Sequence, residues 1–207
     1  TESETLEAFM AEPWIEDASL TVEQALSQKI AVIGEKLSIR RFQKIVSTDG
    51  VVTTYIHGGG KIGVLVELTT DSADAAILEC GKNVAMQTAA LKPLYTSESE
   101  VDASYIEHEK EVLMAQAKNE KPDANEKILT GMVMGRIKKE MKEVCLLDQV
   151  YVKAEDGKQS VAQYVAQVAK ANNATVAVKG FVRFETGEGI EKKEENFAEE
   201  VAKQMNA

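Results

Sequence analysis

The chain has 207 residues, of which 44% are hydrophobic and 28% charged. These values are close to the averages of globular proteins, which excludes a disordered or fibrous chain. Its 34 acidic and 24 basic residues give a net charge of −10, and this disfavours direct nucleic-acid binding, which depends on clustered Lys and Arg. No apolar run approaches the roughly 20 residues of a membrane-spanning helix, and residues 1–4 carry no signal-peptide pattern, so we expect a cytoplasmic protein.

A short amphipathic stretch over residues 2–10 precedes the first well-marked helix. Ser19 or Thr21 is a suitable N-cap for this helix, and apolar residues recur at three- and four-residue spacing up to Ile33. Gly34 then provides a typical helix end. The pattern predicts an amphipathic helix that covers a neighbouring surface.

Three segments rich in β-branched residues follow, at 39–46, 51–56 and 62–68. Glycine-containing turns separate them, at 47–50 and 58–61. Because short connections make neighbouring strands antiparallel, the sequence predicts a three-stranded meander.

The next segments are helical. Residues 71–90 predict a helix with a mainly small apolar face, and residues 102–143 predict two long charged helices separated by a turn at 121–123. Each long helix carries one narrow apolar seam, formed by Ile106, Leu113 and Ala117 on the first and by Leu129, Val133, Ile137, Met141 and Val144 on the second. Such a hairpin is too thin to bury both flanks, so we expect it to dock on another body or on a second copy.

A mixed pattern returns after the hairpin. The sequence predicts a strand at 149–153, a helix at 160–172 capped by Ser160, a strand at 175–185 and a last helix at 190–205. The expected fold is therefore α+β, with antiparallel sheets packed with helices in a two-lobed core. An antiparallel helical hairpin interrupts this core, so the two halves of one sheet come from opposite sides of an insertion.

Residues that commonly carry catalysis or bind metals are few. His57 lies in a glycine-rich turn and His108 in a charged helix, and neither belongs to a metal or nucleophile motif. Cys80 and Cys145 lie on separate apolar stretches, and small buried side chains are the favoured interpretation over a disulfide or a ligand pair. His57 and Lys61 flank flexible glycines where a partner could reach them.

The glycine-rich turn differs from a phosphate-binding loop. In Gly58-Gly59-Gly60-Lys61-Ile62 an isoleucine follows the lysine, and the next element is a strand instead of a helix. A second motif is the acidic stretch at residues 188–195. Its carboxylates alternate with lysines at a predicted helix start, where a solvated surface is usual. Neither motif therefore indicates a nucleotide site or a pair of catalytic carboxylates.

Three groups of residues together carry a specific resemblance. The chain resembles the translation elongation factor Ts family, the guanine-nucleotide exchange factors of elongation factor Tu, from about Leu6 to its C-terminus. The matching stretches are Ile33-Gly34-Glu35 with Ile39-Arg40-Arg41-Phe42, Tyr55-Ile56-His57-Gly58 with Lys61-Ile62-Gly63-Val64-Leu65-Val66, and Gly180-Phe181-Val182-Arg183-Phe184-Glu185 with Gly187-Glu188-Gly189-Ile190-Glu191.

The resemblance implies a protein that is not an enzyme and that needs no cofactor or metal. It would promote GDP release by binding nucleotide-free elongation factor Tu. Transferred by matching motif, the implied partner contacts are Ile33, Gly34, His57 and Gly58, and a weaker match adds Val152 and Lys153.

The resemblance also implies a division of the chain into segments. Residues 1–38 would be the helical remnant of an N-terminal core subdomain, and 39–100 the first part of a C-terminal core subdomain. Residues 101–146 would form a hairpin dimerisation module. Residues 147–207 would complete the C-terminal subdomain and add a C-terminal helix.

The chain departs from the family pattern at its start. The family has an N-terminal helical domain and a Thr-Asp-Phe-Val motif whose Asp-Phe pair enters the GTPase, and this chain contains no Asp-Phe dipeptide. Because it also begins with Thr1, we expect a core and C-terminal fragment.

Two other function classes stay open. One is a scaffold that binds the partner without exchange, and the other is an enzyme using acidic residues of an open cleft.

Overall fold

The computed structural model describes residues 1–190. The expected helix at 190–205 therefore lies outside the described residues, except for Ile190. The helices are α1 Leu6–Ala11, α2 Val22–Ile33, α3 Ala75–Leu91, α4 Ala103–Glu120, α5 Glu126–Val144 and α6 Val161–Ala171, with short 3-10 turns η1 Gly58–Gly60, η2 Glu98–Glu100 and η3 Leu146–Asp148. The strands are β1 Pro13–Trp14, β2 Asp17–Thr21, β3 Gly50–His57, β4 Ile62–Thr70 and β5 Val176–Glu185.

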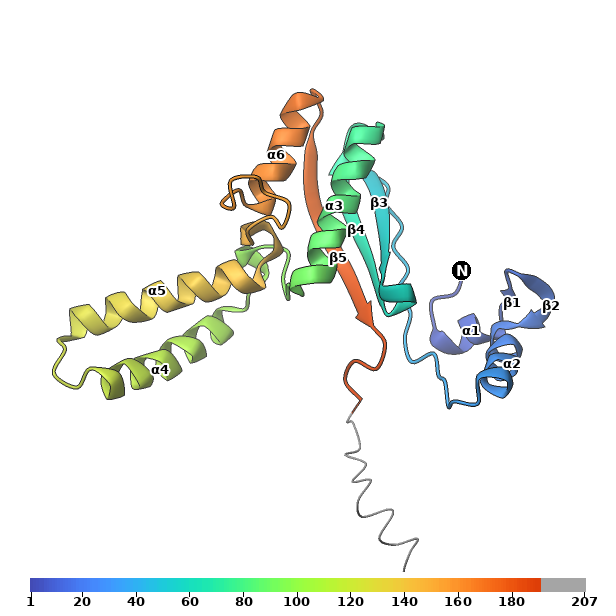
Figure 1. Cartoon of the computed structure of the whole chain (residues 1–207), viewed down its shortest axis with the longest axis horizontal. Coiled ribbons are helices and arrows are strands. Elements are labelled where there is room, and N and C mark those ends of the chain that lie inside the picture. Colours follow the sequence, from blue (N-terminus) through green and yellow to red (C-terminus); the bar gives the residue numbers. More distant parts are fainter. Residues whose placement is uncertain (191–207) are drawn as a thin grey trace, which may run out of the picture.

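The body of the protein is a three-stranded antiparallel sheet in the order β3-β4-β5 (Figure 1). β5 joins the sheet more than 100 residues after β4, with Ile62 opposite Glu185 and Thr70 opposite Val176. The α4–α5 hairpin lies between these strands in the sequence, so the prediction that an insertion separates the two halves of one sheet is confirmed. The α+β class is confirmed as well.

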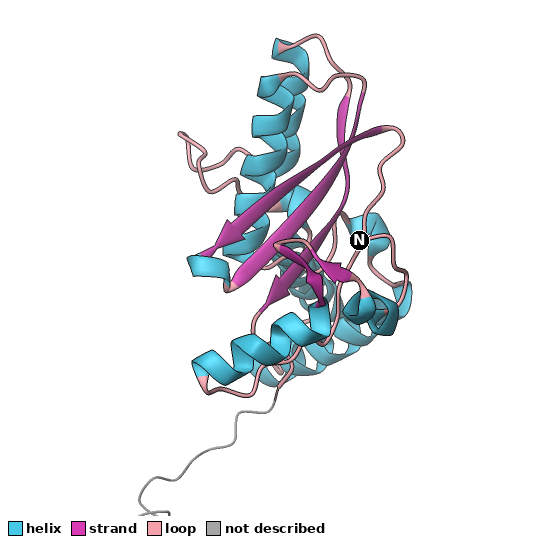
Figure 2. Cartoon of the chain, turned by 90° about the vertical axis from the view of Figure 1, so that its right-hand side faces the viewer, coloured by secondary structure: helices cyan, strands magenta, loops and turns pink. Residues whose placement is uncertain are grey.

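Helices α3 and α6 lie on one face of this sheet (Figures 1 and 2). The central strand β4 buries Val64, Val66 and Leu68, which alternate along the strand and point to the same face. Helix α3 packs closely here, because Gly81 has no side chain. A Cβ added to Gly81 would lie 2.6 Å from the γ atoms of Thr53 on β3. The main core therefore lies between β4 and α3.

Residues 39–46 do not form a strand, so the predicted meander is wrong in its first member. The meander would place this segment beside β3, but in the described sheet the only neighbour of β3 is β4, and β4 has β5 on its other edge. Within residues 1–190, the segment 35–48 makes no backbone–backbone hydrogen bond, and it runs as an extended linker between α2 and β3. Its β-branched composition indicated extended backbone correctly but could not indicate a neighbour.

The N-terminal unit, residues 1–34, contains α1, the short β1–β2 pair and α2. The prediction for α2 is confirmed at both ends. Thr21 and Gln24 form a reciprocal capping box, and Gly34 ends the helix with φ of 77°, a value that favours glycine. Both signals are local, which explains why the sequence was sufficient to place them.

Residues 149–153 also do not form the predicted strand, and Val152 and Lys153 lie in a turn closed by the hydrogen bond from the Ala154 N–H to the Tyr151 carbonyl at 2.9 Å. Val150 makes only an isolated antiparallel bridge with Ser160. In this bridge the Tyr151 N–H donates to the Gln159 carbonyl at 2.8 Å and the Val161 N–H donates to the Gln149 carbonyl at 3.0 Å. The side chain of buried Gln87 on α3 supplies further partners, because its amide donates to the Val150 carbonyl at 3.1 Å and accepts from the Val152 N–H at 2.8 Å.

The α4–α5 hairpin projects away from the sheet on the side opposite the N-terminal unit (Figure 1). Its core is separate from the main one and contains Ala117 with the seam residues of α5, which confirms the predicted seams. At its base, the Tyr105 hydroxyl donates to Glu140 at 2.6 Å, and this hydrogen bond raises the pKa of Tyr105 to about 12. Cys80 and Cys145 are free thiols buried in separate cores, as predicted.

Candidate partner-binding surface

The C-terminal end of α2 presents apolar side chains to solvent. Val32 is 85% exposed and Ile33 is 53% exposed. The Gly34 N–H donates to the Ile30 carbonyl at 2.9 Å, so the left-handed glycine closes the helix directly after these two residues. Both side chains are β-branched, so their χ1 rotation is restricted, and their exposed apolar surface is available for contact with another protein.

The second predicted location is the turn after β3. His57 ends the strand and is exposed, and its Nδ1 lies 2.9 Å from the hydroxyl of Tyr55, two residues earlier on the same face of the strand. The next three residues form η1, and all three are glycines with positive φ. Only glycine adopts such a run without strain, so the turn requires this sequence for its shape. It leaves the imidazole ring and a bare backbone accessible.

These two locations lie toward the same end of the sheet. Residues 36–41, which begin two residues after Gly34, line a shallow hollow together with Gly60, Lys61 and Gly63. The loop that follows β5 completes the hollow. Ile33 and Gly34 are therefore connected to the turn of His57 and Gly58 by a short stretch of chain that packs beside that turn.

Val152 and Lys153 lie elsewhere, in the loop between η3 and α6 on the helical side of the sheet. Val152 is 49% exposed, and the Lys153 Nζ donates to Asn83 on α3 at 2.8 Å. The six predicted contact residues thus do not form one continuous cluster. They fall into two locations, one at the glycine turn and one at the α3–α6 layer.

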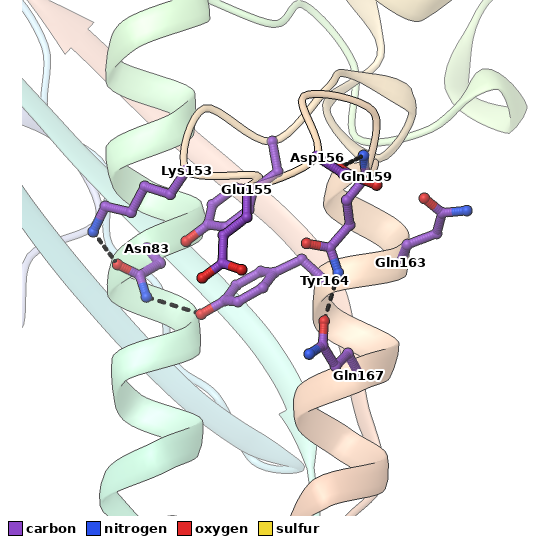
Figure 3. Close-up of a pocket in the computed structure, with 9 residues that line it drawn as sticks. Asn83, Lys153, Glu155, Asp156, Gln159, Gln163, Tyr164 and Gln167 are labelled. Atoms are coloured by element: carbon purple, nitrogen blue, oxygen red, sulfur yellow. Dashed lines mark hydrogen bonds between the residues drawn. The ribbon is translucent and has the colours of Figure 1, made fainter.

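The loop location contains residues that sequence reasoning missed. Asn83 also donates to the hydroxyl of Tyr164 at 2.8 Å, and the ring of Tyr164 stacks on Tyr151 with centroids 4.2 Å apart (Figure 3). Burial raises the pKa of both tyrosines. Gln159, Gln163 and Gln167 complete an open polar hollow. No sequence signal could have found this group, because α3, the loop and α6 meet only in the folded chain.

Among residues 1–190 no group of three or more His, Cys, Asp or Glu side chains is placed to hold a metal ion. No helix in this part of the chain is long and apolar enough to cross a membrane. The fold and the site define an α+β protein in which a helical hairpin is inserted between β4 and β5 of one sheet, with the predicted contact residues at two locations.

Comparison with known proteins identifies the family. The family model described as elongation factor TS matches residues 1–188, so the chain belongs to the elongation factor Ts family. It is similar to elongation factor Ts of Clostridioides difficile (strain 630), with 55% identity over 205 residues, which are 99% of this chain and 65% of that protein. It is also similar to elongation factor Ts of Clostridium perfringens (strain 13 / Type A), with 50% identity over 200 residues. That match covers 96% of this chain and 64% of the relative, so the chain spans slightly under two thirds of the length of these proteins.

Proposed function

We propose that the protein to which this chain belongs is a guanine-nucleotide exchange factor for elongation factor Tu. It promotes GDP release during translation elongation by binding the nucleotide-free GTPase. The observation that carries the proposal is the match of residues 1–188 to the elongation factor Ts family. The exposed residues at the end of α2 and at the glycine turn support it, because they coincide with the contacts that the sequence resemblance implies.

Exchange of this kind needs no reactive side chain. A factor that binds the empty GTPase more tightly than the GDP-bound form weakens GDP binding by the same factor, since coupling between two binding sites is reciprocal. Shifting the ratio of GDP-bound to empty GTPase from 99:1 to 1:99 requires about 5.5 kcal/mol of differential affinity. Contact surface supplies this energy, so the protein acts without being an enzyme in the chemical sense.

The proposed contact residues have distinct roles. Ile33 is an apolar anchor, and Gly34 ends α2 so that this anchor stays exposed. His57 is a polar contact whose ring is oriented by Tyr55, and Gly58 allows the turn that presents it. Val152 and Lys153 supply a second contact on the helical side.

Replacing His57 with alanine tests the role of the glycine turn. We expect His57→Ala to weaken binding to nucleotide-free elongation factor Tu about tenfold, because a buried polar contact at an interface is worth roughly 1.4 kcal/mol. His108→Ala on α4 is the matched control and is expected to leave affinity unchanged. The measurement is release of fluorescent GDP from elongation factor Tu over a concentration series of each variant.

Three outcomes separate the possibilities. Equal affinity of His57→Ala and the parent chain would remove His57 from the site. Tight binding without faster GDP release would favour a scaffold that holds its partner without exchange. The proposed function would be contradicted if neither this chain nor a longer protein that includes the N-terminal part of its relatives bound elongation factor Tu or accelerated GDP release.

We also propose that the hairpin, within residues 101–146, associates with a second copy of the chain. Its helices project from the body and leave apolar side chains in solvent, including Ile128 at 49% and Met134 at 51% exposure. The double substitution Ile128→Lys and Met134→Lys is expected to shift the population toward monomer at micromolar concentration, with helix content unchanged. Sedimentation velocity measures this, and a parent chain that is monomeric throughout would contradict the proposal.

A further inference from the structure

The linker between α2 and β3 contacts both the N-terminal unit and the sheet. Toward the N-terminal unit, the ring of Phe42 stacks on Phe9 with centroids 5.0 Å apart, and the Lys44 Nζ lies 3.6 Å from the carboxylate of Glu2. Toward the sheet, Arg40 and Arg41 reach the loop that follows β5. The helix α2 itself packs against α1, β1 and β2. The linker is therefore the main connection between the end of α2 and the sheet.

Glu188 is the residue that receives the linker. Its carboxylate pairs with Arg41 at 2.5 Å, and its backbone carbonyl accepts a hydrogen bond from Arg40 at 2.6 Å. The guanidinium of Arg41 also lies over the ring of Phe184, 4.3 Å from its centroid. Two successive arginines are thus held by one residue and the strand end beside it.

Glu188 also begins a series of ion pairs that leads from the loop to the end of α3. Its other carboxylate oxygen lies 3.9 Å from Arg183, whose side chain is only 7% exposed. Arg183 in turn pairs with Glu185 at 2.8 Å, and Glu185 pairs with Lys92 at the end of α3. Lys92 and Arg183 together lower the pKa of Glu185 to about 2. Such an alternating network, built on a buried arginine, is screened by salt less than a single surface pair.

The same loop is attached to the glycine turn. The backbone N–H of Thr186 donates to the carbonyl of Lys61 at 2.9 Å, and Lys61 directly follows η1. One short loop, 186–188, therefore binds the residue next to the turn of His57 and also binds the linker that leads back to Gly34.

We propose that Glu188 is a positioning residue that holds the end of α2, with Ile33 and Gly34, at a set distance from the turn of His57 and Gly58. This proposal rests on the proposed function, because it concerns how the two contact regions are presented to one partner. A partner that binds both regions loses less conformational freedom when they are already fixed relative to each other. Glu188 contributes through Arg40 and Arg41 and needs no contact with the partner itself.

The test begins with a distance in the chain alone. Exposed Ser27 on α2 and exposed Thr54 on β3 are replaced with cysteine and carry spin labels. The native Cys80 and Cys145 are buried, and burial raises the pKa of each thiol to about 11, so they react slowly at neutral pH. Double electron–electron resonance then gives the distribution of label distances. Glu188→Gln is expected to broaden this distribution at least about twofold, whereas the matched control Glu107→Gln on α4 leaves it unchanged.

The second measurement uses nucleotide-free elongation factor Tu. Glu188→Gln is expected to weaken affinity about fivefold, the effect of a network contact worth roughly 1 kcal/mol, while the rate of GDP release at saturating factor stays at the parent value. Loss of affinity with an unchanged saturated rate is the signature of positioning, since the bound complex is the same once formed. Glu188→Asp retains the charge and is expected to recover most of the affinity.

The outcomes are separable. An unchanged distance distribution in Glu188→Gln overturns the proposal, and so does a broadened distribution with parent affinity, because positioning would then have no bearing on the site. A fall in the saturated rate as large as the fall in affinity also overturns it. If neither the parent chain nor a longer protein that includes it binds elongation factor Tu, the proposed function fails, and the distance measurement alone decides whether Glu188 holds α2 in place.

Discussion

Replacing Gln87 with methionine is expected to lower the free energy of unfolding by about 3 kcal/mol. The two side chains have similar volume, so the loss comes from hydrogen bonds and not from a cavity. Gln87 is fully buried and donates to the Gln149 side chain and the Val150 carbonyl, both at 3.1 Å, while accepting from the Val152 N–H. Methionine leaves these groups without a partner, and each unpaired buried group costs roughly 1–3 kcal/mol.

The substitution also affects the loop that carries Val152 and Lys153. Urea unfolding followed by circular dichroism gives the stability, and amide hydrogen exchange at Val152 reports the loop directly. Gln28→Met on the exposed face of α2 is the matched control and is expected to change stability by less than about 0.5 kcal/mol. Equal stabilities of the two variants would show that the Gln87 amide is not what holds residues 149–153 in place.

Replacing Leu68 with alanine is expected to cost about 3 kcal/mol of stability. Leu68 is completely buried on the central strand β4, in the cluster that includes Ile77 and Val84 of α3. Removing its branched end loses the transfer free energy of the buried carbons and leaves a cavity beneath α3. The neighbouring helix cannot close this cavity easily, because the short distance at Gly81 already brings α3 against the sheet.

Leu94→Ala provides the control for this comparison. Leu94 is 67% exposed, so the same change in side chain is expected to cost less than about 0.5 kcal/mol. Both variants are measured by urea unfolding under one set of conditions. A Leu68→Ala variant as stable as Leu94→Ala would contradict the placement of the core between β4 and α3.

The two contact locations have a consequence for binding. The turn of His57 lies at one end of the sheet, whereas Val152 and Lys153 lie in the α3–α6 layer. A partner that uses both must extend over the edge of the body, and small relative movements of the two locations would then reduce its affinity. A fixed geometry of the two locations therefore favours the proposed function. Gln87 holds the loop of Val152 and Lys153, and Glu188 is the residue that we propose positions the end of α2.

The helices could be predicted from the sequence because their signals are local. Thr21 with Gln24, and Ser160 with Gln163, form capping boxes in which both partners lie within four residues of each other. The turn between the hairpin helices and the seams of α4 and α5 likewise depend on neighbouring residues. The glycine turn after β3 was predictable for the same reason, since positive φ at successive positions calls for glycine.

The strands required more than local signals. Residues 39–46 and 149–153 have the composition of strands, but a strand exists only where another backbone completes its hydrogen bonds. Composition alone therefore could not distinguish them from β5, which does find a neighbour. Residues 39–46 have no strand beside them in the described sheet, which gains its third strand from β5, more than 100 residues after β4. Residues 149–153 make only an isolated bridge with Ser160, and the buried side chain of Gln87 binds the backbone of Val150 and Val152. The same reasoning holds for the candidate site. The predicted contact residues follow from motifs, but their separation into two locations and the proposed role of Glu188 depend on contacts that only the folded chain makes.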